Sequence, residues 1–451
     1  MISNTLIQSE IDNALSYFKK ANYHEAIKIL EKLIKKQSHF LIYWYLGHCY
    51  FRIYDYSSAI DCIKKSIKLK NPDILNLNFL AEIYLQVYDY DESVRLFNEV
   101  LKIDKTNINS LSKLAKTYFE LGNLNVAEKY YNEVLKIEPN NAGAQYELIK
   151  LNDKYLTDDL IKKLDKDIIT KDQDYLNLIF SKFVLAESFK KNKNYKQELK
   201  SLIDAHTLFL ENNKIASDQE FNYFTNLLPK FMAKIKNSKI KLSCDLKPIF
   251  VMGLPRSGTT LIENIISSSD DNIDPGSETG VISQIFFSKN IISDYNSDIL
   301  ISNFNFEKDG FENLRSSFLD QYHQLKINTK KEVFIDKSLE NLLYIDLISK
   351  IFPNAKFVYC KRNKYANLLG ILKVFLPNIF WSHSIEKIIK FMNLYNNKIE
   401  EIISENKIKI KVIELEKFSH NPNEISKDLF NFLGINWHDK ILINSINKKR
   451  I

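Results

Sequence analysis

Residues 248–262 read PIFVMGLPRSGTTLI, and this stretch decides the fold of the second half of the chain. Its apolar start predicts a buried strand around Phe250, GLPRSG predicts a turn, and TTLIENIISSS from Thr259 has helical periodicity. Strand, loop and helix in this order form a phosphate cradle, because the loop amides and the positive end of the helix bind an anion. We therefore expect an α/β domain with an anion site at this loop.

The loop differs at one position from that of nucleoside triphosphatases. Gly253 and Gly258 have the spacing of GxxxxGK[ST], but Thr259 stands at the lysine position and Thr260 follows it. The lysine of that motif normally reaches the terminal phosphate of a triphosphate. The sequence thus argues against ATP or GTP hydrolysis and favours a nucleotide with fewer phosphates.

The first half of the chain repeats itself every 34 residues. LGHCYFRIYDYSSAI begins at Leu46, LAEIYLQVYDYDESV at Leu80 and LAKTYFELGNLNVAE at Leu114. This period is typical of tetratricopeptide repeats, as are the small residue after each leucine and the tyrosine three positions further on. The resemblance covers roughly residues 7–210 and predicts a superhelix of helical hairpins. Such a surface binds peptides or partner proteins, or it packs on the domain that follows.

The composition excludes several classes of protein. No stretch of the 451 residues approaches the roughly 18 uninterrupted apolar residues of a membrane span, and the start lacks the pattern of a signal peptide, so we expect a cytoplasmic protein. The net charge of +7 comes from lysines spread along the chain, which indicates a compositional bias rather than a nucleic-acid site. The four cysteines are scattered and the histidines form no ligand pairs, so we expect neither disulfides nor a metal.

The segment PRSGTTL resembles the phosphosulfate-binding loop of sulfotransferases. From Pro248 to its end the chain is similar to bacterial proteins that join tetratricopeptide repeats to a sulfotransferase akin to tyrosylprotein sulfotransferases. The further matching stretches are PGSETGVI, FIDKSLENLLYIDLISKIFPNAKFVYCKRN, WSHSIEKIIKFMNLY and VIELEKFSHNPNEISKDLFNFLGINW. The resemblance implies a repeat array over 1–210, a helical connector over 211–247 and a three-layer α/β domain with a mainly parallel sheet over 248–451.

The resemblance also implies the donor and the site residues. The donor is 3′-phosphoadenosine 5′-phosphosulfate (PAPS), whose sulfuryl group passes to an acceptor hydroxyl without a metal. Arg256 and Lys337 would neutralise the transition-state charge, Glu278 would be the general base, and Arg362 would clamp the 3′-phosphate. The loop residues that would bind the phosphosulfate are Pro255, Arg256, Ser257, Gly258, Thr259 and Thr260.

The acceptor implied by the resemblance is a tyrosine of a protein or peptide that the repeat array holds, with a sugar or small alcohol as the alternative. Each charged candidate also has a structural interpretation. Arg256 is then a surface charge, Lys337 a partner of Asp336, Glu278 a solvated loop acid and Arg362 the cap of a strand.

Two departures from the family leave other functions open. Gly370 stands where the family usually has a serine that binds the 3′-phosphate, and the chain stops at INSINKKRI, where Lys448, Lys449 and Arg450 could replace a longer closing segment. A non-catalytic adaptor is therefore one alternative. The other is a phosphate-loop kinase, in which Asp336 at the end of VFID would bind magnesium.

Overall fold

The computed structural model describes residues 4–70, 73–170, 174–269, 273, 275–289, 304–329 and 332–447. Lys448, Lys449 and Arg450 lie outside the described residues. The chain packs into two compact units. The first unit comprises Met1–Ser110, Pro229–Pro248 and Gly276–Ala355, and the second comprises Leu111–Leu228, Ile249–Pro275 and Lys356–Ile451.

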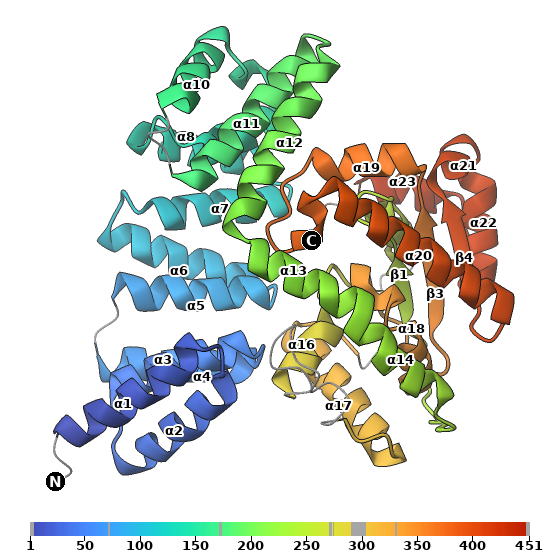
Figure 1. Ribbon diagram of the computed structural model, residues 1–451, viewed down its shortest axis with the longest axis horizontal. Coiled ribbons are helices and arrows are strands. Elements are labelled where there is room, and N and C mark those ends of the chain that lie inside the picture. The colour runs from blue at the N-terminus through green and yellow to red at the C-terminus, as the bar shows by residue number, and fades with distance from the viewer. Residues whose placement is uncertain are drawn as a thin grey trace. The chain divides into compact units, whose positions relative to one another are not determined.

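The first unit begins with helical hairpins that stack in chain order (Figure 1). Small residues let the two helices of a hairpin approach closely, since a Cβ on Gly47 would lie 2.5 Å from Cδ1 of Ile63. The predicted repeat leucines Leu46 and Leu80 are buried between the helices. These helices are α1 (Asn4–Lys19), α2 (Tyr23–Lys36), α3 (Phe40–Arg52), α4 (Tyr56–Leu69), α5 (Ile74–Gln86) and α6 (Tyr90–Ile103), and α7 (Ile108–Glu120) follows them.

The hairpin turns share one conformation at equivalent repeat positions. Tyr54 and Tyr88, which are 34 residues apart, have positive φ angles of 64° and 59°. The next residue caps the second helix: Asp55 accepts a hydrogen bond from the Ser58 amide at 3.1 Å, and Asp89 accepts one from the Glu92 amide at 3.3 Å. The left-handed residue reverses the chain and the aspartate satisfies the first amides of the helix.

The remainder of the first unit surrounds an aromatic core of Phe231, Phe286, Phe304 and Phe311, all buried. Helix α17 contacts two successive hairpin turns. Gln321 Nε2 donates to the Tyr54 carbonyl at 3.1 Å, and Lys326 just after the helix pairs with Asp89 at 2.6 Å. The elements are α14 (Leu228–Asn237, which begins in the second unit), α16 (Val281–Ser288), α17 (Lys308–Gln324), β2 (Ile335–Asp336), η4 (Leu339–Leu342) and α18 (Ile345–Ile351).

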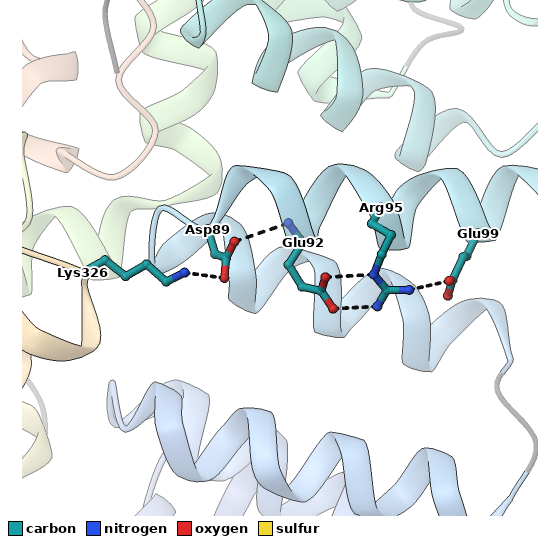
Figure 2. A network of polar contacts seen from close by, with 5 residues as sticks. All are labelled: Asp89, Glu92, Arg95, Glu99 and Lys326. Atoms are coloured by element: carbon teal, nitrogen blue, oxygen red, sulfur yellow. Dashed lines mark hydrogen bonds and ion pairs between the residues drawn. The ribbon is translucent and has the colours of Figure 1, made fainter.

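Figure 2 shows the contact at Asp89. One carboxylate oxygen of Asp89 binds Lys326 and the other accepts the Glu92 amide, while Arg95 binds Glu92 and Glu99 along the same face of α6. The helix cap and the contact with the α17 segment therefore use the same side chain.

The second unit carries the later repeat helices. Helices α11 and α12 form an antiparallel hairpin (Figure 1). The helices are α8 (Leu124–Ile137), α9 (Ala142–Leu151), η1 (Asp153–Tyr155), α10 (Asp158–Thr170), α11 (Tyr175–Lys191), α12 (Tyr195–Asn212), α13 (Lys214–Asn222) and the π-helical turn η2 (Tyr223–Leu227).

A parallel sheet forms the centre of the α/β part of this unit. Strand β3 pairs with β1 on one side, with Phe250 opposite Phe357, and with β4 on the other, with Tyr359 opposite Val412. Strand β1 is buried throughout, as expected for a parallel strand covered on both faces. The elements are β1 (Ile249–Met252), α15 (Thr259–Ser267), β3 (Lys356–Lys361), α19 (Lys364–Leu372), η5 (Phe380–His383), α20 (Ile385–Glu405), β4 (Ile410–Glu414), α21 (Leu415–His420), α22 (Pro422–Leu433) and α23 (Lys440–Asn447).

Helix α12 packs against the segment between α19 and α20 in the same unit. His206 and His383 are both buried, with their Nδ1 atoms 2.8 Å apart, and Phe375 contacts both Phe209 and His383. Burial lowers the pKa of His206 and lowers that of His383 to about 3. These two histidines are core residues.

The predicted fold class, a helical repeat array followed by an α/β domain with a parallel sheet, is confirmed. Over the described ranges, the helices are either too short or too polar to cross a bilayer.

Candidate functional site

The phosphate loop lies at the carboxyl end of β1 in the second unit. A Cβ on Gly253 would lie 2.4 Å from Ser257 Oγ and 2.7 Å from the Cys360 carbonyl oxygen, so only glycine fits there. Gly258, the N-cap of α15, has a φ of +96°, and a Cβ on it would lie 2.8 Å from Leu415 Cδ1. The two glycines let the loop run against β3 and α21 and then enter the helix, as a phosphate cradle requires.

Arg256 lies in this loop with its backbone in the left-handed region, at a φ of +67°. Two side chains hold the carbonyl groups around it. Asn367 Nδ2 donates to the Pro255 oxygen at 2.7 Å, and Arg362 Nη1 donates to the Arg256 oxygen at 2.8 Å. A non-glycine residue keeps a positive φ where its surroundings fix it, and these two bonds do so. The Arg256 side chain is exposed and can reach a ligand.

A pocket of about 430 Å³ opens beside the loop, at the carboxyl ends of the strands, which is where open α/β sheets bind ligands. Its lining includes three cations, Lys361, Arg362 and Lys364, two carboxylates, Glu414 and Glu416, and Ser257. The Ser257 hydroxyl is buried and has no hydrogen-bond partner among the described residues. A buried hydroxyl without a partner is costly, and an anionic oxygen in the pocket would accept a hydrogen bond from it. The residues present therefore fit a phosphorylated ligand.

Gly370 packs against both arginines of this site. A Cβ at this position would lie 3.1 Å from Arg256 Cβ and 3.3 Å from Arg362 Nη1. The position where the family usually has a serine is therefore a close approach of α19 to the loop. The absence of a side chain at Gly370 leaves room for Arg362 Nη1 to donate to the Arg256 carbonyl.

Glu278 and Lys337 meet in the first unit, although 59 residues separate them in the chain, with Nζ and Oε1 3.2 Å apart. The Lys337 side chain is 7% exposed and that of Glu278 is 55% exposed. A Cβ on Gly276 would lie 1.6 Å from the Ile335 carbonyl oxygen, so the segment before Glu278 runs directly against β2. The pair thus consists of a buried ammonium group and a carboxylate that solvent and a ligand can reach.

Asp336 fixes the strand end that carries Lys337. Its Oδ1 accepts from the Ser338 amide and hydroxyl, at 2.8 and 2.7 Å, and from Asn341 Nδ2 at 2.8 Å. Its Oδ2 accepts from the Tyr322 hydroxyl and from Thr279 Oγ1. Burial and the Asp336 charge raise the pKa of Tyr322, which keeps this hydroxyl a donor. Both carboxylate oxygens are occupied by protein donors.

A further carboxyl group, that of Glu340, lies close to these residues. Ser283 Oγ donates to its Oε1 at 3.2 Å. Burial raises the pKa of Glu340, and the charges of Asp336 and Glu278 act in the same direction. Across the described ranges, no three His, Cys, Asp or Glu side chains gather into a group that could hold a metal ion.

The structure brings the predicted residues together in two groups. Arg256, Arg362 and the loop residues Pro255 to Thr260 lie in the second unit, and Glu278 lies with Lys337 in the first. Sequence reasoning missed Asn367 and Tyr322. Neither belongs to a short motif, because Asn367 acts through a hydrogen bond from α19 to the loop at Pro255 and Tyr322 through one from α17 to Asp336 in β2.

Comparisons with known proteins agree with the sequence resemblance. Residues 248–439 match the sulfotransferase family, residues 84–150 match a tetratricopeptide repeat, and residues 19–100 match the anaphase-promoting complex, cyclosome, subunit 3 family. The chain therefore carries a sulfotransferase-family domain after tetratricopeptide repeats, as the sequence predicts.

Two curated proteins are similar to parts of the chain. An uncharacterized protein of Aquifex aeolicus is 23% identical over 66% of this chain and 40% of its own length. Protein-tyrosine sulfotransferase 1 of Danio rerio is 26% identical over 44% of this chain and 56% of its own length. The chain thus spans about half the length of these relatives.

Solved structures are similar to this chain at low TM-scores. A crystal structure of MamA covers 40% of this chain and 96% of its own, with 17% identity and a TM-score of 0.31. The C-terminal part of a tetratricopeptide protein from Cytophaga hutchinsonii covers 65% of this chain and 99% of its own, with 13% identity and a TM-score of 0.34.

Proposed function

We propose that this protein is a sulfotransferase that moves a sulfuryl group from PAPS to an acceptor hydroxyl. The observation that carries the proposal is the phosphate loop with its adjoining pocket. The loop lacks the lysine of triphosphatases, presents Arg256 and contains a buried serine hydroxyl that no described residue bonds to. The match of residues 248–439 to the sulfotransferase family supports the same ligand.

In this proposal the donor lies along the loop and the pocket. The amides and hydroxyls of Ser257, Thr259 and Thr260 bind the 5′-phosphosulfate at the start of α15. Arg362, held by its bond to the loop, presents its remaining donors to the 3′-phosphate, with Lys361 and Lys364 as further cations.

The transfer breaks the bond between the sulfur and the bridging oxygen of PAPS and forms a bond between the sulfur and the acceptor oxygen. Adenosine 3′,5′-bisphosphate leaves with the electron pair of the broken bond. Glu278 takes the acceptor proton, for which its exposure suits it, while Arg256 and Lys337 stabilise the charge on the sulfuryl and bridging oxygens. A base in this position typically contributes about 10²–10⁴-fold to the rate.

The acceptor that we propose is a tyrosine of a protein or peptide. The similarity to a protein-tyrosine sulfotransferase supports a tyrosine, and the repeat array supports a peptide, because tetratricopeptide surfaces bind extended chains. We also propose the division into a repeat array over 1–210, a connector over 211–247 and a sulfotransferase domain over 248–451.

One observation weighs against the kinase and another against the adaptor. Five hydrogen bonds already occupy the Asp336 carboxylate, which weighs against its use as a magnesium ligand. An adaptor has no need of a loop arginine whose backbone two side chains hold.

Calorimetric titration with adenosine 3′,5′-bisphosphate in EDTA tests the donor site. We expect micromolar binding, weakened about ten- to a hundredfold in Arg256→Ala because a charge-assisted hydrogen bond is lost. Arg95→Ala on the repeat helix α6 is the matched control and should bind as the wild type does. Absence of binding at millimolar ligand would refute the proposal and favour the adaptor, and binding of ATP only with Mg²⁺ would favour the kinase.

A further inference from the structure

A line of hydrogen bonds joins the second repeat hairpin to the loop that carries Glu278, within the first unit. Gln321 on α17 donates from Nε2 to the Tyr54 carbonyl at 3.1 Å and to Gln284 Oε1 at 2.8 Å. Gln284 on α16 then donates from Nε2 to the Thr279 carbonyl at 2.5 Å. Thr279 follows Glu278 directly, so three hydrogen bonds connect the repeat turn to the residue beside the base.

The chemistry of the two ends fixes the direction of this line. Both termini are backbone carbonyls, which only accept, so Gln321 must use both of its N–H groups while Gln284 accepts one bond and donates the other. The Gln321 side chain is buried, and the Tyr54 carbonyl belongs to the left-handed turn residue of the hairpin. A side chain that could not donate would lose the bonds to the Tyr54 carbonyl and to Gln284.

The same helix also holds the other half of the Glu278–Lys337 pair. Tyr322, next to Gln321, donates its hydroxyl to Asp336, which precedes Lys337. The Gly280 amide and Thr279 Oγ1 both contact Ser338 Oγ, at 2.8 and 3.3 Å, which closes the connection between the two loops. Helix α17 is thus connected to both members of the Glu278–Lys337 pair. Gln321 is linked through Gln284 to the loop of Glu278, and Tyr322 bonds to Asp336, which precedes Lys337.

We propose that Gln321 and Gln284 are positioning residues for the reaction, through which the second repeat hairpin sets the place of Glu278. The hairpin is then a structural part of the reaction centre as well as a part of the repeat surface. This inference rests on the proposed sulfotransferase activity for the role of Glu278. The hydrogen-bonded line itself does not depend on that activity.

The α17 helix offers a matched control. Gln324 accepts from the Ser57 amide at 3.1 Å and so contacts the same hairpin, but no hydrogen bond described here joins it to Gln284 or Thr279. Gln321→Met and Gln324→Met therefore remove equivalent amide groups from one helix, and only the first breaks the line. Gln284→Met breaks it from the other side without touching the repeats.

Two measurements on the full chain test the inference. We expect Gln321→Met and Gln284→Met to lower kcat about tenfold, because a displaced base loses alignment with the acceptor, and to leave the Kd for adenosine 3′,5′-bisphosphate within about twofold. Hydrogen exchange of the segment 278–280, read by mass spectrometry, should accelerate about fivefold or more in both. The double variant should resemble either single one, and Gln324→Met should match the wild type in both measurements.

The outcomes separate the inference from the proposed function. If the wild type transfers no sulfuryl group, the proposed function fails, and the exchange of 278–280 still decides whether the glutamines hold the loop. The inference is wrong if hydrogen exchange of 278–280 is the same in Gln321→Met and Gln284→Met as in Gln324→Met. It is also wrong if the wild type is active and all three variants have the same kcat. Should Gln321→Met fail to fold, Gln284→Met carries the same comparison.

Discussion

Gly370 lies where the backbone of α19 meets the stem of Arg256 and the guanidinium of Arg362. The family resemblance presents this glycine as a lost hydroxyl, because it implies a serine there that binds the 3′-phosphate. The geometry gives it a second role, because a Cβ would press on the residue whose carbonyl Arg362 holds. The two roles predict opposite effects of a serine at this position on the affinity for the nucleotide: the hydroxyl would strengthen binding, and the Cβ would weaken it.

We expect Gly370→Ser to bind adenosine 3′,5′-bisphosphate about three- to tenfold more weakly than the wild type, because the loop must move by a few tenths of an ångström. Gly370→Ala adds the Cβ without the hydroxyl and should bind more weakly still. In the free energy of unfolding, the higher helix propensity of alanine, worth up to about 1 kcal/mol, should offset part of the cost of this close approach. Calorimetry and urea unfolding check the two effects, and a serine variant that binds more tightly than the wild type would contradict the steric role.

At this scale, sequence reasoning selects residues that belong to short patterns. Arg256 follows from its glycine loop, and the contact between Glu278 and Lys337 is consistent with the roles that the family resemblance gives them. Asn367, Gln284 and Gln321 could not be predicted, because a lone amide on a helix has no pattern that reveals which distant carbonyl it meets. Their identification required the packing of three separate elements.

At the scale of elements, the repeat period determines more than the helices. The left-handed Tyr54 and Tyr88 and the capping Asp55 and Asp89 recur 34 residues apart, so successive turns present the same groups at regular intervals. The α17 segment uses this regularity, contacting one turn through Gln321 and the next through Lys326. The period predicts the turns, but which helix would contact them depends on residues far along the chain.

Asp89 allows the cap and the interhelical contact to be separated. Asp89→Asn keeps an oxygen for the Glu92 amide and removes the charge that binds Lys326, so we expect the free energy of unfolding to fall by at most about 1 kcal/mol. Asp89→Ala also removes the cap and should cost about 1 kcal/mol more. Urea unfolding of both variants, each with and without Lys326→Met, measures the contributions of the helix cap and of the ion pair with Lys326 separately. Equal losses in the two single variants would show that the cap contributes nothing.

At the scale of the whole molecule, the units of packing differ from the boundaries that sequence patterns mark. Each unit combines repeat helices with part of the α/β half. In the first unit the turns before α4 and α6 contact the α17 segment, and in the second α12 packs with the segment after α19. The 34-residue period shows where the repeats lie but does not indicate which later segments pack on them. A change inside the array should therefore affect the stability of a whole unit.

His48, inside the array, provides such a test through pH. Its ring stacks on Phe79 with centroids 3.7 Å apart, and its buried Nε2 has no partner among the described residues. Burial, with a smaller effect of Arg52, lowers the pKa of His48 from 6.5 to about 4. The unfolded chain therefore binds the proton more readily than the folded one, and stability is lost as pH falls from about 6.5 towards 4.

Between pH 7 and pH 5 this histidine alone should reduce the free energy of unfolding by about 2 kcal/mol. His48→Phe keeps an aromatic ring against Phe79 and cannot titrate, so its stability should fall less over the same interval by about that amount. Urea unfolding of both proteins at the two pH values measures the difference, in which the contributions of His206, His383 and the other titrating groups cancel. If both proteins lose the same stability, folding does not lower the pKa of His48, and the array would have to open to solvent there.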